Sequence, residues 1–274
     1  MTSLQLGWFT TGRGAGSFAL LRATQEAIER GDINGRIAVL FCNREYGEAE
    51  PTDRLLDYAA AQDIPVVTLS SVAFRKREGG ERSRPGEPLP AWRAAYDQAV
   101  AVALDDHPFE LGMLAGYMLI TTPSFCRHFP LLNLHPAAPG GPKGTWQEVI
   151  WKLIEDGATE SGVSIHVVTP ELDEGPIVSF CRYGLEMPEW DILNANEVSE
   201  LRVTYGEELP LFKALRQRGF EREQPLVLAT LRAAGEGAFS VELGRAFDSE
   251  GEELRPLDLT EAVEHFLHSA TSRR

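Results

Sequence analysis

The sequence contains little cysteine and few basic residues, and both shortages narrow the possible functions. Its 274 residues include three cysteines, Cys42, Cys126 and Cys181, which are widely spaced and form no CxxC pair. We therefore expect reduced, buried thiols rather than a disulfide framework or a cysteine zinc site. Lys and Arg number 26 against 41 Asp and Glu, a formal net charge of −15. Because such a surface repels phosphate backbones, we expect no nucleic-acid partner, although a small phosphorylated substrate can still bind in a local pocket.

Long apolar runs are also absent. No run approaches the roughly 20 residues that a membrane-spanning helix needs. The opening stretch MTSLQLGWFTTGRGAG lacks the basic segment and the apolar core of a secretory signal. We therefore expect no membrane partner and a cytoplasmic location. A composition of 43% hydrophobic and 24% charged residues is that of a folded globular protein and excludes wholesale disorder.

Short apolar runs alternate with amphipathic stretches over much of the chain. We predict strands at 4–10, 36–43, 64–70, 109–117, 131–135 and 163–169. We predict helices at 18–30, 53–62, 91–107 and 146–157, and a loop at 75–90. Apolar runs without polar alternation fit strands that are covered on both faces. The pattern therefore predicts an α/β fold with a doubly wound, mostly parallel sheet of the Rossmann type.

The pattern weakens after Gly184. Residues 197–217 are predicted to be helical, and 225–231 and 238–244 are predicted to pair as a hairpin. A closing helix is expected at 260–270. We therefore divide the chain into an α/β domain at 1–220 and a small C-terminal extension, hairpin plus helix, at 221–274.

A glycine turn follows the first predicted strand and opens the first helix. It consists of Gly12, Arg13, Gly14, Ala15, Gly16 and Ser17. Glycines let backbone N–H groups approach a ligand, and the helix N-terminus favours an anion, so a phosphate fits here. Arg13 could add a charge-assisted contact. The spacing is GxGxG rather than the dinucleotide pattern GxGxxG. An ordinary connecting turn and a nicotinamide site both stay open as alternatives.

Asn133, His135 and Asp173 form the more informative group. Asn133 and His135 lie two apart in a predicted strand, so they project from the same face at its carboxyl end. Asp173 lies in a turn after the strand at 163–169 and could reach the same edge. An amide N–H and a protonated imidazole can hold the oxyanion of a tetrahedral intermediate, while a carboxylate assists proton removal. This chemistry suits acyl transfer to an amine, although each residue alone also fits a merely structural role.

Three motifs extend this interpretation. LAGYM (114–118), NLHP (133–136) and SGVSIHVVTPELDEGPIV (161–178) resemble the formyltetrahydrofolate-dependent formyltransferases. The resemblance runs from the first strand to about 178 and more loosely to about 220. It implies that Asn133, His135 and Asp173 are catalytic, that His166 supports the site, and that the glycine turn holds a ribonucleotide phosphate.

The resemblance also implies 10-formyltetrahydrofolate as formyl donor and no metal. The folate would lie between Tyr117–Thr121 and the loop at 168–175. The residues implied to contact it are Tyr117, Met118, Leu119, Ile120, Thr121, Val168, Pro170, Glu171 and Asp173.

The chain departs from the family pattern at three places. The turn usually reads GxGSN, and this sequence lacks the Asn after Ser17. The usual MRIL is replaced by MLIT, with Leu119 in place of Arg. The usual SLLP after the histidine is replaced by AAPG at 137–140. These changes leave the predicted catalytic residues intact and leave the acceptor amine open.

The sequence thus predicts an enzyme that transfers a formyl group to a primary amine. The members acting on glycinamide ribonucleotide in purine biosynthesis are the nearest in pattern. Alternatives are another acceptor, such as an amino sugar or a biosynthetic amine, or water, as in a deformylase. A nicotinamide-dependent oxidoreductase and a non-catalytic folate or nucleotide sensor are alternatives from other classes. The oligomeric state is open, with a homodimer as one option.

Overall fold

The computed structural model describes residues 3–83, 87–194 and 196–271. The chain folds into two compact units, each built from segments that are distant in sequence. The first unit comprises Met1–Asn133, Val167–Pro176 and Arg232–Leu254. The second comprises Leu134–His166, Ile177–Leu231 and Arg255–Arg274. Each unit is described separately below.

The first unit contains a parallel sheet. Its strands are β1 (Leu4–Thr10), β2 (Gly35–Cys42), β3 (Val66–Thr68), β4 (Leu111–Leu114) and the start of β5 (Leu131–His135). Their order is β5-β4-β1-β2-β3, and every neighbouring pair is parallel. The predicted parallel α/β sheet is therefore confirmed.

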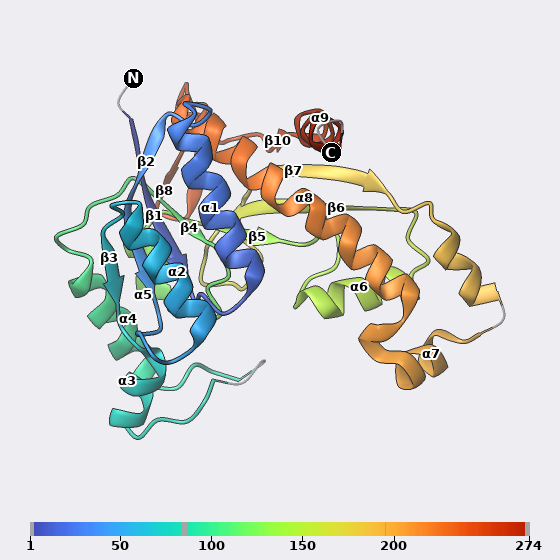
Figure 1. Cartoon of the computed structure of the whole chain (residues 1–274), viewed down its shortest axis with the longest axis horizontal. Helices are drawn as coiled ribbons and strands as arrows, with labels where there is room; N and C mark the ends of the chain where they lie inside the picture. Colours follow the sequence, from blue (N-terminus) through green and yellow to red (C-terminus); the bar gives the residue numbers. More distant parts are fainter. Residues whose placement is uncertain (1–2, 84–86, 195, 272–274) are drawn as a thin grey trace. The chain divides into compact units, whose positions relative to one another are not determined.

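Helices cover both faces of this sheet. They are α1 (Ala15–Glu29), α2 (Glu50–Ala61), α3 (Ser71–Arg77), α4 (Trp92–Ala103) and α5 (Pro123–His128). The near face in Figure 1 carries α1 and α2. On the other face, Phe9 packs in one cluster with Tyr96 of α4 and Phe125 of α5. The consecutive residues Trp8 and Phe9 are both fully buried, which explains why the strand carries no polar alternation.

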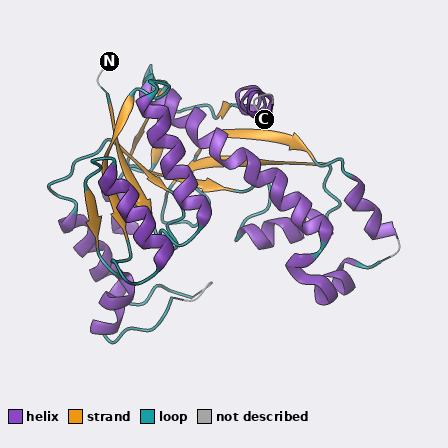
Figure 2. Ribbon diagram, viewed as in Figure 1, coloured by secondary structure: helices purple, strands orange, loops and turns teal. Residues whose placement is uncertain are grey.

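The second unit contains β6 (Glu160–Val167), β7 (Ile177–Gly184) and β10 (Leu257–Asp258) in the order β10-β7-β6. β6 and β7 are antiparallel, whereas β7 and β10 are parallel. The helices, shown in purple in Figure 2, include α6 (Trp146–Glu155), α7 (Val198–Tyr205), α8 (Pro210–Gly235) and α9 (Thr260–Thr271). Short 3-10 turns lie at Pro188–Asn194 and Gly206–Glu208.

The hairpin predicted from 225–231 is wrong, because these residues lie inside α8. A short apolar run does not distinguish a strand from a buried helix segment. Leu226 and Leu231 are buried, and the Thr230 hydroxyl donates to the Leu226 carbonyl one helical turn earlier at 2.7 Å. The actual hairpin is formed by β8 (Phe239–Glu242) and β9 (Arg245–Asp248).

The predicted loop at 75–90 begins later than expected. α3 extends to Arg77, and the Ser70 hydroxyl caps it by accepting the Ala73 N–H at 3.0 Å. Ser is among the residues that favour this capping position. The first three residues of the predicted loop, 75–77, are therefore helical.

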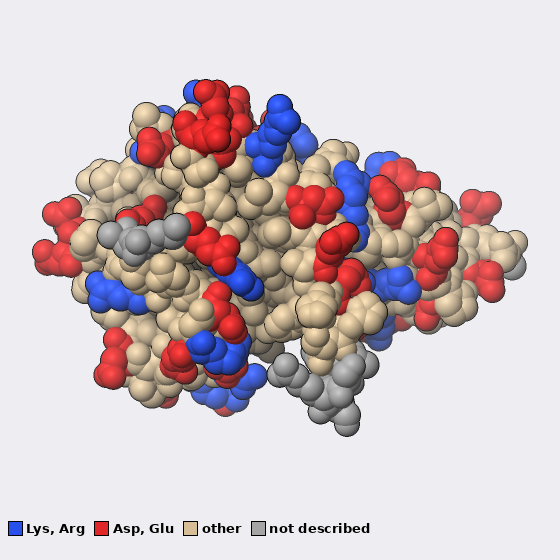
Figure 3. Space-filling view, turned by 90° about the horizontal axis from the view of Figure 1, so that it is seen from above, with Lys and Arg blue, Asp and Glu red and all other residues tan. Residues whose placement is uncertain are grey.

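Acidic and basic side chains are mixed on the surface. On the face shown in Figure 3, Lys and Arg lie among Asp and Glu and gather in no broad patch. Among the described helices, none is long and apolar enough to cross a membrane.

Candidate functional site

The carboxyl ends of neighbouring strands bring three predicted segments to one edge of the first unit. β1 ends before the glycine turn, β4 ends before Ala115, and Leu114 is the register partner of Asn133 on β5. The Thr11 N–H donates to the Gly116 carbonyl at 3.1 Å, and the Thr11 hydroxyl accepts the Met118 N–H at 2.9 Å. Open α/β sheets bind ligands at this edge. Thr11, the residue directly before the glycine turn, therefore holds the start of the predicted folate segment beside that turn.

The glycine turn leaves a helix N-terminus accessible. α1 begins at Ala15 with Gly14 as its N-cap, and no side chain within the described residues caps it. Arg13, Gly14 and Ala15 are exposed, whereas Ser17 is buried. The first-turn N–H groups of a helix and its positive dipole end attract an anion. The backbone at the predicted phosphate position is therefore of the kind that attracts an anion, a helix N-terminus with no side-chain cap among the described residues.

Gly116 allows the turn and the next segment to pack closely. Its φ is +71°, and a Cβ added there would lie 2.2 Å from the Ser17 hydroxyl oxygen. A side chain at this position would push the two segments apart.

Residues 117–121 present two apolar side chains to solvent. Met118 is 78% exposed and Ile120 is 36% exposed. In contrast, Tyr117 is buried against Phe9 and Phe41 with ring centroids 6.2 Å apart, and Thr121 is also buried. Burial raises the pKa of the Tyr117 hydroxyl above its usual range. The segment is thus anchored at both ends and offers an apolar surface between them.

The loop at 167–176 forms the other predicted folate contact. Its Val168 N–H donates to the Leu131 carbonyl of β5 at 2.8 Å, so the loop starts beside that strand. The loop closes on itself, because the Val167 N–H donates to the Pro176 carbonyl at 2.9 Å. The Val168 side chain lies in the core, so among the predicted folate contacts this one is available only through its backbone.

Asp173 lies in the left-handed backbone region, with φ of +56°. Asp tolerates this conformation better than most residues. Pro170 and Glu171 before it are exposed, as is Leu172 at 58%. The turn therefore presents a half-buried carboxylate beside exposed apolar and acidic side chains.

His135 is the last residue of β5 and belongs to the second unit. It is 8% exposed, and its Nε2 lies 3.0 Å from the Pro142 carbonyl oxygen. Since a carbonyl only accepts, Nε2 carries the hydrogen. The ring also contacts His166 edge-on, with centroids 6.3 Å apart. Both neighbours restrict the orientation of the imidazole, and the supporting role of His166 stays a prediction.

The predicted catalytic residues are divided between the units. Asn133 and Asp173 belong to the first unit, and His135 belongs to the second. Asn133 and His135 remain two apart on β5, as predicted. The meeting of all three side chains at one point stays a prediction.

A buried ion pair next to the predicted folate segment was not predicted from the sequence. Arg93 and Asp97 of α4 are 1% and 2% exposed, with Nη2 and Oδ1 3.2 Å apart. Their i,i+4 spacing on a largely apolar helix was visible in the sequence, but such pairs usually lie on a solvated face. Burial raises the pKa of Asp97, and the Arg93 guanidinium opposes that shift.

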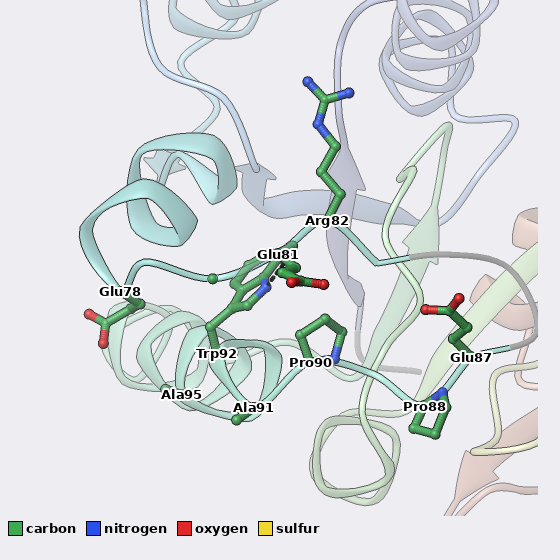
Figure 4. Close-up of a pocket in the computed structure, with 10 residues that line it drawn as sticks. Glu78, Glu81, Arg82, Glu87, Pro88, Pro90, Ala91, Trp92 and Ala95 are labelled. Atoms are coloured by element: carbon green, nitrogen blue, oxygen red, sulfur yellow. Dashed lines mark hydrogen bonds between the residues drawn. The ribbon is translucent and has the colours of Figure 1, made fainter.

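The first unit also contains a cavity of about 580 Å³ away from the predicted site residues. Segments 78–82 and 87–91 line it together with Trp92 and Ala95 (Figure 4). The Trp92 indole N–H donates to the Glu81 carbonyl at 2.8 Å, which fixes the ring against the loop. Within residues 3–83, 87–194 and 196–271, no three or more His, Cys, Asp or Glu side chains are grouped to hold a metal ion.

Comparisons with known proteins show to which family the chain belongs. The family model described as formyl transferase matches residues 14–182. Phosphoribosylglycinamide formyltransferase of Escherichia coli is 30% identical over 166 residues, 60% of this chain and 67% of the relative. The Haemophilus influenzae protein of the same name is 38% identical over 162 residues, 58% of this chain and 64% of the relative. The chain thus spans about two thirds of the length of these relatives.

Solved structures show the same fold. A phosphoribosylglycinamide formyltransferase from Coxiella burnetii aligns with a TM-score of 0.62 and 22% identity, covering 93% of this chain and 99% of that one. A formyltetrahydrofolate deformylase from Pseudomonas syringae aligns with a TM-score of 0.59 and 17% identity, covering 90% and 66%. The match to the family model covers more than half of the sequence. The chain therefore belongs to the formyl transferase family.

Proposed function

We propose that the protein transfers a formyl group from 10-formyltetrahydrofolate to a primary amine, that of glycinamide ribonucleotide in the first place. The observation that carries this proposal is that Thr11, directly before the glycine turn, bonds to Gly116 and Met118 at the start of the predicted folate segment. It puts an anion-binding helix terminus next to an apolar surface at the edge that ends in Asn133. A phosphorylated amine and a folate can therefore meet there. The names of the relatives support the choice of donor and acceptor.

In the proposed reaction the amine nitrogen attacks the formyl carbon and a new N–C bond forms. The Asn133 amide N–H and the protonated His135 hold the oxyanion of the tetrahedral intermediate. The bond to N10 of the folate then breaks, and N10 takes a proton while the amine loses one. Asp173 orients His135 and assists that proton transfer through water. No covalent bond to the enzyme is needed, because the donor is already activated.

We assign the binding of the two substrates to groups that are exposed at this edge. The first-turn N–H groups at 14–17 and Arg13 hold the phosphate. Met118 and Ile120, whose side chains point outward, contact the folate, and Val168 contributes its backbone only. We also propose a cytoplasmic location for the reaction.

The test is an assay with 10-formyltetrahydrofolate and three acceptor conditions: glycinamide ribonucleotide, an amino sugar, and no amine. Mass spectrometry detects the formylated product, and tetrahydrofolate release is followed in parallel. We expect product with glycinamide ribonucleotide. Release of tetrahydrofolate at the same rate without amine would instead identify a deformylase, and no response to the folate would refute the proposal.

Variants test the assigned residues. His135→Ala and Asp173→Asn should each lower kcat by about 10² to 10⁴ while leaving the thermal midpoint nearly unchanged. His128→Ala is the control for the first, because His128 is an exposed histidine of α5. Asp63→Asn is the control for the second, because Asp63 is an exposed aspartate with a similar φ of +53°. Near-normal turnover in either site variant would contradict the mechanism.

A further inference from the structure

The buried pair Arg93–Asp97 is poorly suited to a purely stabilising role. Removing two charges from water costs several kcal/mol per ion, and apolar replacements of similar volume are often as stable or more stable. The pair is also incompletely satisfied, because Arg93 Nε and Nη1 have no hydrogen-bond partner among the described residues. The Arg93 guanidinium lies 5.1 Å from the Trp92 ring and 5.5 Å from the Tyr96 ring. Such contacts offset only part of the desolvation.

Both members of the pair reach the same stretch of backbone. Arg93 Nη2 donates to the Ile120 carbonyl at 2.6 Å. Asp97 Oδ2 accepts the Thr122 N–H at 2.8 Å. These residues lie between β4 and α5, where the chain has no regular secondary structure to satisfy its polar groups. Hydrogen bonds to charged groups are stronger than neutral ones, so the two contacts fix this backbone firmly.

The opposite end of the segment is held by Thr11, which accepts the Met118 N–H and donates to the Gly116 carbonyl. Residues 116–122 are therefore fixed at both ends, while Met118 and Ile120 project outward. A ligand that binds to a surface already in place loses less free energy in ordering it.

We propose that Arg93 and Asp97 are positioning residues that hold the segment 116–122 in the conformation that receives the folate. The inference rests on the proposed function. It states that this pair increases the affinity for the folate and does not affect the affinity for the amine. The pair acts through the backbone of Ile120 and Thr122 and touches neither reacting group. Without it, the carbonyl and the N–H lose their partners and the segment becomes mobile in the unliganded protein.

The experiment replaces the pair by apolar residues, Arg93→Met together with Asp97→Leu, in the full chain. The dissociation constant for 10-formyl-5,8-dideazafolate, a stable donor analogue, is measured by calorimetry, and the dissociation constant for glycinamide ribonucleotide is measured in parallel. We expect a thermal midpoint close to that of the wild type, because the removed desolvation cost offsets the loss of the two backbone contacts. We expect folate affinity to fall about tenfold, equivalent to about 1.4 kcal/mol, with amine affinity unchanged. The control is Glu50→Leu with Arg54→Met, an exposed pair with the same spacing on α2.

A second variant covers the case in which the double variant fails to fold. Thr122→Pro removes the N–H that Asp97 accepts, and the φ of −78° at Thr122 already suits proline. It should weaken folate binding with no effect on amine binding. Unchanged folate affinity in a folded variant, or equal loss for both ligands, would overturn the inference while leaving the proposed function intact. Failure of both variants to fold would assign the pair to stability and also overturn it. A wild-type protein that does not bind the analogue would overturn the proposed function, and this inference with it.

Discussion

Gly175 is the position at which a single added methyl group should do most damage to the proposed site. A Cβ built there lies 1.8 Å from the Val167 carbonyl oxygen and 2.9 Å from its carbonyl carbon. Both neighbours are backbone atoms, so no side-chain rotation can relieve the contact. Because Cβ contacts under 3.0 Å essentially never occur, the backbone at Val167 and Gly175 must separate by about 1.2 Å in Gly175→Ala.

This shift reaches Asp173, which lies two residues earlier in the same loop. The loop is closed by the Val167 N–H, which donates to the Pro176 carbonyl at 2.9 Å, so the widening cannot be absorbed at that end without breaking a hydrogen bond. A displacement of a reacting group by about 1 Å can cost about 10² in rate. We therefore expect Gly175→Ala to lower kcat by about 10², and to lower the thermal midpoint because the strained loop destabilises the fold.

The assay is steady-state formyl transfer with both substrates varied, alongside thermal unfolding. Gly184→Ala is the matched control, since nothing lies within 4 Å of its added Cβ and its φ is not in the left-handed region. The control should keep wild-type kcat and stability. A Gly175→Ala protein that is folded, keeps its thermal midpoint and turns over at the wild-type rate would refute the role assigned to this loop.

Two further predictions concern stability. Leu243 begins the β8–β9 turn with φ of +49° and is 85% exposed. Leu243→Asn should therefore relieve left-handed backbone strain without loss of apolar burial. We expect the free energy of unfolding to rise by about 1 kcal/mol and the thermal midpoint, measured by calorimetry, to rise by about 2 °C. A lower midpoint would contradict this. Burial raises the pKa of Cys42 and of Cys181 from 9.0 to about 11, so the neutral thiols favour the folded state fully below pH 9, and this contribution is lost as the pH rises toward 11. Urea unfolding at pH 8 and pH 10.5 should show the decline, of up to about 2.7 kcal/mol per thiol by pH 11. Cys42→Ala and Cys181→Ala should flatten it, and a profile equally steep in both variants would exclude the thiols as its cause.

The strands of the first unit were predictable from the sequence because both of their faces are buried. β1 and β2 are buried on both faces after their first two residues, so beyond Gln5 and Arg36 each appears in the sequence as a mainly apolar run. The carboxyl edge followed from the same pattern, and with it the neighbourhood of the glycine turn, residues 117–121 and Asn133. The segment 225–231 failed for the opposite reason: its apolar positions belong to a long helix, and over seven residues the two periods are not distinguishable.

The contacts that hold the irregular segments of the predicted site are tertiary contacts between residues distant in sequence. Regular strands satisfy most of their own backbone groups, and Asn133 lies in β5 opposite Leu114 of β4. The segments at 115–122 and 167–176 are irregular, and their buried N–H and carbonyl groups need partners from elsewhere. For residues 116–122 those partners are Thr11 and the pair Arg93–Asp97. For the loop at 167–176 they include the Leu131 carbonyl, which accepts the Val168 N–H.

Such contacts join residues many positions apart and leave no periodic trace in the sequence. A carboxylate on α4 has the same appearance in the sequence whether it faces solvent or an amide of Thr122. Residues 116–122 therefore illustrate a difference between two kinds of residue in the predicted site. The residues expected to touch the ligand were accessible from local motifs, whereas the residues that hold those motifs in place became visible only through the tertiary contacts. For this reason the paired substitution of Arg93 and Asp97 is the sharper test of how the site is built, since it removes the support and leaves every predicted ligand contact unchanged.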